Sequence, residues 1–294
     1  MNTDVIDTSP ETIPSGMGSP VADPQFIRLE NINKVFGRHK SKALRMLEQG
    51  AASEEITNET ECHVALRDIN LSIPSNGIYC IMGLSGSGKS TLLRHINRLI
   101  DPDTGTVWVG DEDVTALSIP QLQKFRQKRI AMVFQHFGLL PHFNVQQNAE
   151  FALRVRGVPK PERAEQARYW LNEVELSGYE SHYYDELSGG MRQRVGLARA
   201  LAAGTDILLM DEPFSALDPL IRRKLQTLLL DLQDRLNKTI VFITHDVDEA
   251  RTLGGNVALL NQGCLVQQGT LDELAANPAD EYVASFVAPT TERV

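Results

Sequence analysis

The sequence feature that most constrains the fold is a glycine-rich segment, residues 83–91, which reads Gly-Leu-Ser-Gly-Ser-Gly-Lys-Ser-Thr. It matches the pattern GxxxxGK followed by S or T in full. It follows the apolar run 78–82, which predicts a strand covered on both faces, and it precedes a predicted helix over about 89–100. Glycines let backbone N–H groups approach phosphate oxygens closely, and a helix N-terminus favours an anion. We therefore expect a phosphate-binding loop made of Gly83, Leu84, Ser85, Gly86, Ser87, Gly88, Lys89, Ser90 and Thr91, in which Lys89 supplies a charge to the phosphates and Ser90 a ligand to Mg²⁺.

The same strand and helix signals recur along the chain. The apolar runs 207–210 and 240–243 also read as strands covered on both faces. Between them a helix is predicted over 219–236, with Asp218 as its N-cap and Pro219 as its first residue. Buried strands that alternate with helices predict an α/β fold with a largely parallel core sheet.

Other segments fill in the organisation. A first strand is predicted at 26–32, two short helices within the charged stretch 38–62, and a half-buried strand at 69–73, where polar and apolar residues alternate. A hairpin is predicted over 257–266, followed by a helical region that starts with a capping box of Thr and Glu. Residues 136–187 show no comparable buried strand and read as a mostly helical insertion.

Two adjacent carboxylates end the predicted strand 207–210. Asp211 and Glu212 would face the ligand crevice, because the carboxyl ends of parallel strands border that crevice. Asp211 suits a contact to Mg²⁺, and Glu212, one residue further, suits a general base that aligns the attacking water. The alternative is a plain acidic helix cap at the end of a strand.

A second candidate anion site lies about 100 residues further along the chain than the phosphate-binding loop. Ser188, Gly189 and Gly190 precede an Ala- and Leu-rich helix that ends before Gly204, so Ser188 is a candidate N-cap and two bare N–H groups follow it. Read alone, the segment could be no more than a capped helix. One nucleotide does not obviously need both sites from one subunit, which suggests a dimer in which each nucleotide contacts the loop of one chain and the Ser-Gly-Gly of the other.

Composition excludes several classes of protein. The net charge of −9 gives the chain no general affinity for DNA or an anionic membrane. The basic residues Lys124, Arg126, Lys128 and Arg129 are therefore read as a solvated face, and no nucleic-acid partner is expected. Three widely spaced cysteines suit a reducing cytosol, and no apolar run or secretory signal indicates membrane insertion or export. Residues 1–25 read as a disordered tail, and any membrane role would run through a partner.

The motifs, in this order, resemble those of ATP-binding-cassette (ABC) ATPases over about residues 26–270. The resemblance identifies 83–91 as the Walker A loop, 207–212 as the Walker B strand, 187–191 as the signature and 215–218 as the D-loop. It implies a P-loop NTPase (RecA-like) core of ABC type with an antiparallel β subdomain and a helical insertion subdomain, and it implies ATP and Mg²⁺ as ligands. The signature departs from its commonest form at Met191, where Gln is usual.

The same resemblance implies roles for three residues whose chemistry alone would be weak evidence. Gln135 of the Q-loop would lie near Mg²⁺ together with Ser90 and Asp211 and take part in catalysis. His245 would be the switch histidine that contacts the γ-phosphate, and Phe36 would stack on adenine.

A closer resemblance is to the ATPase subunits of quaternary-amine importers, which take up glycine betaine, proline betaine, choline or trimethylamine N-oxide. It is carried by the 38–62 insertion and by the stretches 82–88, 137–142 and 186–197. It implies a peripheral subunit on the cytoplasmic face of the inner membrane that works with a second copy of itself, contacts permease subunits through 136–156, and serves a periplasmic substrate-binding protein indirectly. The apolar residues expected to receive a permease helix are Phe137, Leu139, Leu140 and Phe143.

This interpretation divides the chain into the tail 1–25, one ATPase domain over 26–270 that includes the helical subdomain 136–187, and a short helical tail over 271–294. Some members of the family that the chain resembles carry a further pair of regulatory domains, and on this interpretation we expect no such pair in 271–294. The alternative function is a soluble ABC-type ATPase that is not attached to a transporter. A GTPase is disfavoured, because the Asn-Lys-x-Asp motif fails at Ile240.

Overall fold

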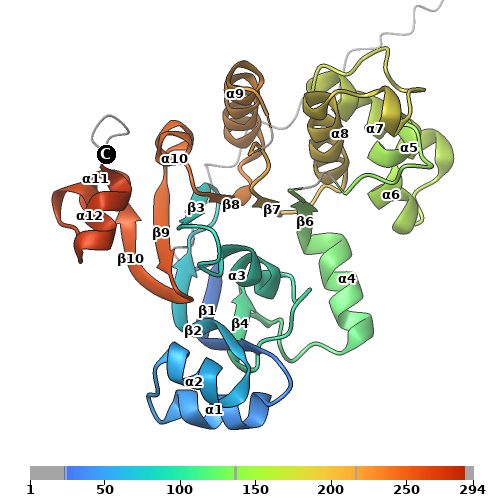
Figure 1. Ribbon diagram of the computed structural model, residues 1–294. Coiled ribbons are helices and arrows are strands. Elements are labelled where there is room, and N and C mark those ends of the chain that lie inside the picture. Colours follow the sequence, from blue (N-terminus) through green and yellow to red (C-terminus); the bar gives the residue numbers. More distant parts are fainter. Residues whose placement is uncertain (1–22, 24, 136–137, 216, 289–294) are drawn as a thin grey trace, which may run out of the picture.

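The computed structural model of the chain describes Asp23 and residues 25–135, 138–215 and 217–288 (Figure 1). The predicted disordered tail, residues 1–25, lies outside the described residues except for Asp23 and Gln25. The Asp23 N–H donates to Ser75 Oγ at 2.8 Å, and its carbonyl accepts from the Ser75 N–H at 2.8 Å. These bonds tie the start of the described chain to the turn before the strand 78–82.

Strands and helices alternate through most of the described chain. The strands are β1 (Ile27–Phe36), β2 (His63–Ile73), β3 (Ile78–Met82), β4 (Thr104–Val109), β5 (Glu112–Asp113), β6 (Ile130–Val133), β7 (Ile207–Asp211), β8 (Thr239–Thr244), β9 (Asn256–Asn261) and β10 (Cys264–Thr270). The helices are α1 (Lys40–Glu48), α2 (Ser53–Thr60), α3 (Lys89–Ile96), α4 (Ile119–Arg129), α5 (Val145–Ala149), α6 (Phe151–Val155), α7 (Lys160–Glu173), the 3₁₀ turn η1 (Tyr184–Glu186), α8 (Gly189–Ala202), α9 (Pro219–Leu236), α10 (Val247–Leu253), α11 (Leu271–Ala276) and α12 (Glu281–Val287).

The central sheet has the order β10-β9-β3-β8-β7-β6 among the described residues, and its strands are parallel except for β10. Successive side chains of a strand point to opposite faces. On β3, Cys80 and Met82 therefore enter one hydrophobic core, and Tyr79 and Ile81 enter another. The predicted α/β class and the prediction that these apolar strands are covered on both faces are confirmed.

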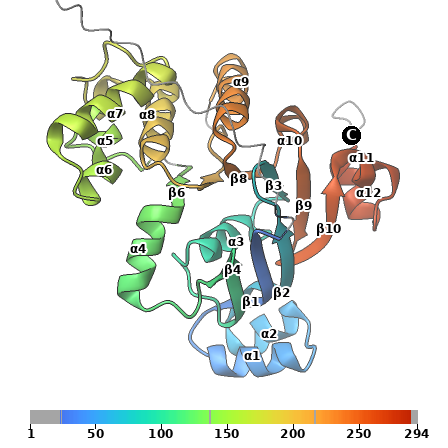
Figure 2. The same ribbon diagram turned by 180° about the vertical axis from the view of Figure 1, so that it is seen from behind.

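Different elements cover the two faces of the central sheet (Figure 2). An antiparallel sheet of order β2-β1-β4-β5 shares the core of Tyr79 and Ile81, together with α3. Helices α8, α9 and α10 share the other core, to which α9 contributes Leu225, Leu229 and Leu232. The helix α9 has the predicted bounds, and the Asp218 carboxylate accepts hydrogen bonds from the N–H groups of Leu220 and Ile221.

The helical insertion lies beyond the edge strand β6 (Figure 1). Its described residues, 138–187, contain α5, α6, α7 and η1 and no strand, as predicted. They pack against α8, and buried Ala167 and Leu171 of α7 join the core of the central sheet. The mostly helical character predicted for this segment is therefore confirmed in its described residues, whereas the division into domains stays a prediction.

The stretch 38–62 forms the two predicted helices, α1 and α2, at the end of the antiparallel sheet (Figure 1). They have a small hydrophobic core of their own, made of Ala43, Leu47, Ile56 and Cys62 together with Val35 and Val64. At the other end of the chain, α11 and α12 pack their apolar side chains on the main core. In the described part of the chain, no helix combines the length and the apolar character needed to cross a membrane.

The helix after the glycine-rich loop is shorter than predicted. It ends at Ile96 instead of near residue 100, because Arg98 adopts a left-handed conformation with φ of 51°. The Arg98 side chain then turns back to donate hydrogen bonds to the carbonyls of Val114 and Leu117. The chain thus leaves the helix early to reach the antiparallel sheet.

Candidate nucleotide-binding site

The predicted site residues come together where parallel strands end. The phosphate-binding loop follows β3, Gln135 follows β6, Asp211 and Glu212 close β7, and His245 follows β8. Most of these residues line a cavity of about 650 Å³, in the place where open α/β sheets bind ligands, whereas Gly83, Ser87 and Asp211 do not line it. The cavity is lined by Phe36, His63, Ala65, Leu84, Ser85, Gly86, Gly88, Lys89, Ser90, Thr91, Gln135, Glu212 and His245.

The loop between β3 and α3 takes a shape that only glycine allows at two positions. Gly83 has a φ of +147°, and a Cβ there would lie 2.3 Å from the carbonyl oxygen of Leu260. Gly88 has a φ of +100°, and a Cβ there would lie 2.6 Å from the carbonyl oxygen of Ala65. The loop is therefore clamped between β9 and β2, with its backbone N–H groups at the start of α3.

Lys89 lies inside this loop and is only 5% exposed. Its Nζ donates to the carbonyl oxygens of Gly83 and Leu84, both at 2.9 Å, and lies 3.8 Å from a carboxylate oxygen of Glu212. Burial lowers the pKa of Lys89, and the charges of Glu212 and Asp211 act against that shift. The Ser87 hydroxyl in the same loop is buried and has no hydrogen-bond partner among the described residues.

Asp211 is almost fully buried, with 1% of its surface exposed, and its charge is compensated by two residues of α3. Ser90 Oγ donates to Asp211 Oδ1 at 2.7 Å, and Arg94 Nη2 donates to Asp211 Oδ2 at 3.2 Å. The structure therefore brings together two of the three predicted Mg²⁺ ligands, Ser90 and Asp211, whereas the third, Gln135, contacts Glu212. Sequence reasoning missed Arg94, although its place one helical turn after Ser90 was a usable signal.

Glu212 lines the cavity. It has a left-handed φ of 43°, a conformation that costs free energy in a residue with a side chain and that recurs at functional sites. Its Oε2 lies 3.4 Å from Gln135 Nε2 and 3.4 Å from His245 Nδ1. Gln135 and His245 thus both lie next to Glu212, and each of these three residues assigned to catalysis comes from a different strand end.

Phe36 is the last residue of β1 and lines the cavity. It comes from the antiparallel sheet, whereas the phosphate-binding loop and the three residues assigned to catalysis follow strands of the central sheet. Its side chain is 40% exposed, so an aromatic base has access to it. Two lysine ammonium groups lie near its ring: Lys34 Nζ is 5.4 Å and Lys40 Nζ is 5.9 Å from the ring centroid. Neither lysine was singled out from the sequence.

The signature residues lie elsewhere on the chain. Ser188 is the N-cap of α8, as predicted, and its hydroxyl accepts from the Met191 N–H at 3.3 Å. Ser188 and Gly189 are exposed, Gly190 is half-buried, and none of the three is among the described residues that line the cavity. Within one chain the two candidate anion sites therefore remain apart, as sharing between two copies requires.

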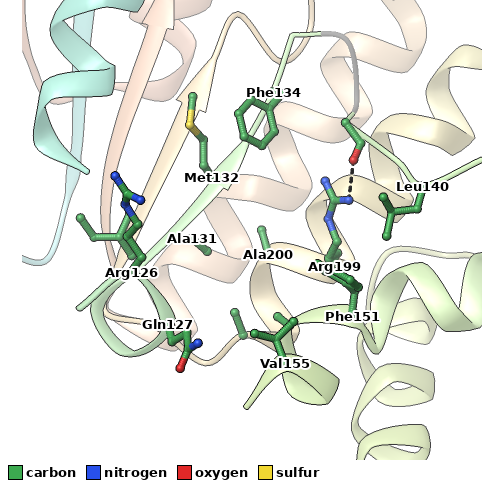
Figure 3. Close-up of a pocket in the computed structure, with 14 residues that line it drawn as sticks. Arg126, Gln127, Ala131, Met132, Phe134, Leu140, Phe151, Val155, Arg199 and Ala200 are labelled. Carbon is green, nitrogen blue, oxygen red and sulfur yellow. Dashed lines mark hydrogen bonds between the residues drawn. The ribbon is translucent and has the colours of Figure 1, made fainter. Parts of the chain in front are cut away.

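A second cavity, of about 380 Å³, lies between β6, α4, α6 and α8 (Figure 3). Its lining is mostly apolar, with Phe134, Leu140, Phe151 and Val155 on its walls. The Arg199 guanidinium donates to the carbonyl oxygen of Gly138 at 2.6 Å on one side of it. The cavity begins next to the Q-loop and reaches into the segment 136–156.

The apolar patch predicted in this region is only partly present. Leu139 belongs to the hydrophobic core instead of the surface, because it packs with the main core and is 9% exposed. Leu140 lines the second cavity, and Phe143 is half-buried with its ring 6.1 Å from that of Phe151. Phe137 lies outside the described residues.

The chain is similar in sequence and in fold to known proteins. Residues 66–215 match the family described as ABC transporter. The chain is 48% identical over 264 residues to the glycine betaine transport ATP-binding protein OpuAA of Bacillus subtilis, an alignment that covers 90% of this chain and 63% of that protein. It is 48% identical over 260 residues to the glycine betaine/proline betaine transport system ATP-binding protein ProV of Escherichia coli, covering 88% of this chain and 65% of that protein. The chain thus spans less than two thirds of the length of these two relatives.

A shorter relative is matched over more of its length. The trimethylamine N-oxide transport system ATP-binding protein TmoW of Ruegeria pomeroyi is 44% identical over 271 residues, covering 92% of this chain and 78% of that protein. Among solved structures, a dimeric ATP-binding cassette in a post-hydrolysis state with ADP and Pi superposes with a TM-score of 0.71 at 32% identity, covering 83% of this chain and 98% of that one.

A glycine-rich loop between a buried strand and a helix, with a buried Asp and a neighbouring Glu across the cavity, defines a P-loop nucleotide-binding protein. The family match, the relatives and the superposed cassette narrow that class further. The chain belongs to the ABC transporter family.

Proposed function

We propose that the chain is the ATP-hydrolysing subunit of an importer for a quaternary amine or a similar osmolyte, and that two copies act together. The observation that carries the proposal is the convergence of Lys89, Glu212, Gln135 and His245 on one cavity at the ends of β3, β7, β6 and β8. The substrate class rests on the relatives, whose names assign them to the transport of glycine betaine, proline betaine, choline or trimethylamine N-oxide.

The residues of the cavity suit the steps of ATP hydrolysis. Lys89 would exchange its bonds to the loop carbonyls for bonds to the β- and γ-phosphates, which are stronger because they join opposite charges. Glu212, held by Gln135 and His245, would accept a proton from the water that attacks the γ-phosphate. His245 would also contact the γ-phosphate, and Phe36 would stack on the base.

Mg²⁺ fits the oxygen atoms at the end of β7. The Ser90 hydroxyl and the Asp211 carboxylate are hard oxygen ligands 2.7 Å apart, and the Gln135 amide oxygen is available from the neighbouring segment. When bound, the ion would neutralise charge on the phosphates. Such ions keep several waters and phosphate oxygens as ligands, so a few protein atoms suffice.

The exposed signature suits a site shared between copies. Ser188, Gly189 and Gly190 would close over the γ-phosphate bound to the loop of the partner copy, and hydrolysis would remove the group that both copies hold. The dimeric state of the superposed cassette supports this arrangement.

The second cavity suits the contact with a permease subunit. Its apolar walls, from Phe134, Leu140, Phe151 and Val155, would receive a short helix of the permease next to the Q-loop, so that movement there reaches Gln135. The chain would then sit on the cytoplasmic face of the inner membrane without crossing it, and the periplasmic substrate-binding protein would act through the permease.

Uptake measurements test this function. Cells that lack the chain should lose uptake of at least one labelled compound among glycine betaine, proline betaine, choline and trimethylamine N-oxide, and the wild-type chain should restore it, whereas Lys89→Ala should not. Normal uptake of every one of these compounds without the chain, combined with ATP hydrolysis by the purified protein, would favour the alternative of a soluble ABC-type ATPase.

A further inference from the structure

The helices α1 and α2 have no role in the steps above, although they follow closely after Phe36, which lines the cavity. The chain enters them directly after Phe36, through Gly37, whose φ is +142° and where a Cβ would lie 2.6 Å from Cys62 Sγ. Phe36 itself is 40% exposed. A ring so exposed is not fixed by core packing, and a mobile ring would lose conformational entropy when a base stacks on it.

The two lysines beside Phe36 supply such a fixing contact. Lys34 Nζ and Lys40 Nζ lie 5.4 Å and 5.9 Å from the ring centroid, within the range in which an ammonium group is attracted to an aromatic ring. Lys34 comes from β1, whereas Lys40 is the first residue of α1. The 38–62 insertion therefore contributes Lys40, one of the two positive charges next to the Phe36 ring.

Asp103 contacts both lysines, and Lys34 Nζ also donates to the carbonyl oxygen of Asp101 at 2.6 Å. Asp103 Oδ1 accepts from Lys34 Nζ and from Lys40 Nζ, each at 3.3 Å, and Asp103 Oδ2 accepts from the Val35 N–H at 2.7 Å. Burial alone would raise the pKa of Asp103, but the Val35 hydrogen bond and the two lysine charges outweigh burial and leave that pKa below its ordinary value. Asp103 is therefore a fixed anion that joins β1, α1 and the segment before β4.

Core packing holds the 38–62 insertion, and with it Lys40, in a defined position. Ala43 and Leu47 of α1 are buried against Ile56 of α2 and against Val35 of β1. Val35 also donates its N–H to Asp103, so the core of the insertion and the anion share one strand residue. The position of Lys40 is thus set by packing and not by solvent-exposed contacts alone.

We propose that Lys40 and Asp103 are positioning residues for the nucleotide base: Asp103 holds Lys34 and Lys40 against Phe36, and the fixed ring stacks on adenine. This inference rests on the proposed function, because it deepens the role of Phe36 there. It also assigns a role to the 38–62 insertion, which places the Lys40 ammonium group of α1 next to the Phe36 ring of β1.

Binding of ADP and of pyrophosphate to the full-length chain separates base stacking from phosphate binding, and neither ligand is hydrolysed. Lys40→Met should weaken ADP binding roughly three- to tenfold and leave pyrophosphate binding unchanged, since the phosphate-binding loop is untouched. Lys42→Met is the matched control: Lys42 is two residues further along α1 and pairs with Glu59 at 2.8 Å, so both affinities should stay as in the wild type.

Asp103→Asn changes the charge in the opposite sense and should nevertheless weaken ADP binding by a similar factor. A long-range effect of charge on the anionic ligand would instead move the two variants in opposite directions. Equal losses of ADP and pyrophosphate affinity in Lys40→Met, or ADP affinities of Lys40→Met and Lys42→Met that do not differ, would overturn the inference.

Phe36→Ala distinguishes failure of the inference from failure of the proposed function. We expect Phe36→Ala to weaken ADP binding, and Lys40→Met to add nothing to that loss in the double variant, because both act through the ring. If Phe36→Ala leaves ADP binding intact, the proposed stacking role of Phe36 is wrong. If it weakens ADP binding and the Lys40→Met loss is fully additive, only the positioning role of Lys40 is wrong.

Discussion

Replacing Glu212 by Gln removes the negative charge at the centre of the nucleotide site and keeps the size of the side chain. In the structure this carboxylate lies 3.8 Å from Lys89 Nζ and 3.4 Å from His245 Nδ1. It is also the group that we assign as the acceptor of a proton from the attacking water. The substitution therefore changes binding and chemistry in opposite ways.

The magnitudes follow from the geometry and from the assigned role. Loss of a general base typically costs a factor of about 10² to 10⁴ in rate. Binding should not suffer, because Glu212 and the triphosphate compete for Lys89. At an effective dielectric constant of about 20, the attraction between unit charges near 4 Å is about 4 kcal/mol, and the variant removes this competing interaction. ATP should therefore bind as tightly as before or more tightly.

Single-turnover hydrolysis of ATP labelled in the γ-phosphate, measured beside equilibrium binding of the same nucleotide, checks both expectations. Glu175→Gln serves as the control for the loss of one negative charge, since Glu175 pairs with Arg194 near the helical insertion and does not line the cavity. Hydrolysis by Glu212→Gln within about tenfold of the wild-type rate would refute the assignment of Glu212 as the base.

Three further outcomes are expected. Gly83→Ala should lower the free energy of unfolding by about 1–3 kcal/mol, because its Cβ would lie 2.3 Å from the Leu260 carbonyl oxygen. A Cβ at Gly86 meets nothing within 4 Å, so Gly86→Ala should lower the free energy of unfolding by less. Thermal melting of both variants measures this difference. Leu171→Ala, at a fully buried position of α7, should cost about 2–5 kcal/mol in denaturant unfolding, and a loss under 1 kcal/mol would show that the helical insertion does not share the main core. Burial raises the pKa of Glu249 above its ordinary value of 4.5, so the folded state holds this proton more tightly than the unfolded chain and the wild type loses stability as pH rises from 4.5 through the folded pKa. Glu249→Gln should then melt at a higher temperature than the wild type at pH 7, and the difference should vanish below about pH 4.5; equal melting temperatures at pH 7 would contradict this.

Elements with strong local signals could be predicted from the sequence. The helix α9 begins at Pro219, after the N-cap Asp218, and ends at Leu236, before Asn237, which takes a left-handed conformation. Its bounds were therefore predictable from residue types. The strand β3 was equally predictable, because its sequence is an unbroken apolar run, and the structure buries all of its residues. The strand ends then placed the phosphate-binding loop, the Asp211–Glu212 pair and His245 at one edge of the sheet.

Elements without such signals were missed. The helix α4 buries only Leu122 and Phe125 and is otherwise polar, so it lacks the apolar stripe that marks a helix. Its local signals lie at the ends: a proline in the first turn, basic residues in the last turn, and a capping box in which Gln121 Oε1 accepts the Ser118 N–H at 2.9 Å. The strand β4 carries Gly105 and two threonines and reads as a loop until it pairs with β1.

Contacts between residues far apart in the chain also could not be predicted from the sequence. Asp103 meets Lys34 across 69 residues and Lys40 across 63 residues, and no local pattern predicts that these charges share one oxygen atom. The same holds for Leu139, which looked like part of an exposed patch and is instead buried by the packing of the helical insertion. Sequence alone thus predicted most of the residues that line the cavity but not the side chains that hold them in place.

The central claim is that ATP joins two copies of the chain, with the loop of one and Ser188 of the other on the same nucleotide. The most direct measurement is the mass of the Glu212→Gln chain in solution by sedimentation, with ATP and Mg²⁺ or with ADP. We predict a particle of two 32.7 kDa chains with ATP and one chain with ADP, and a single chain in both cases when Ser188→Arg is added although ATP still binds. A single-chain particle with ATP bound at every concentration, while the wild type hydrolyses ATP at a rate per chain that is independent of concentration, would contradict the claim.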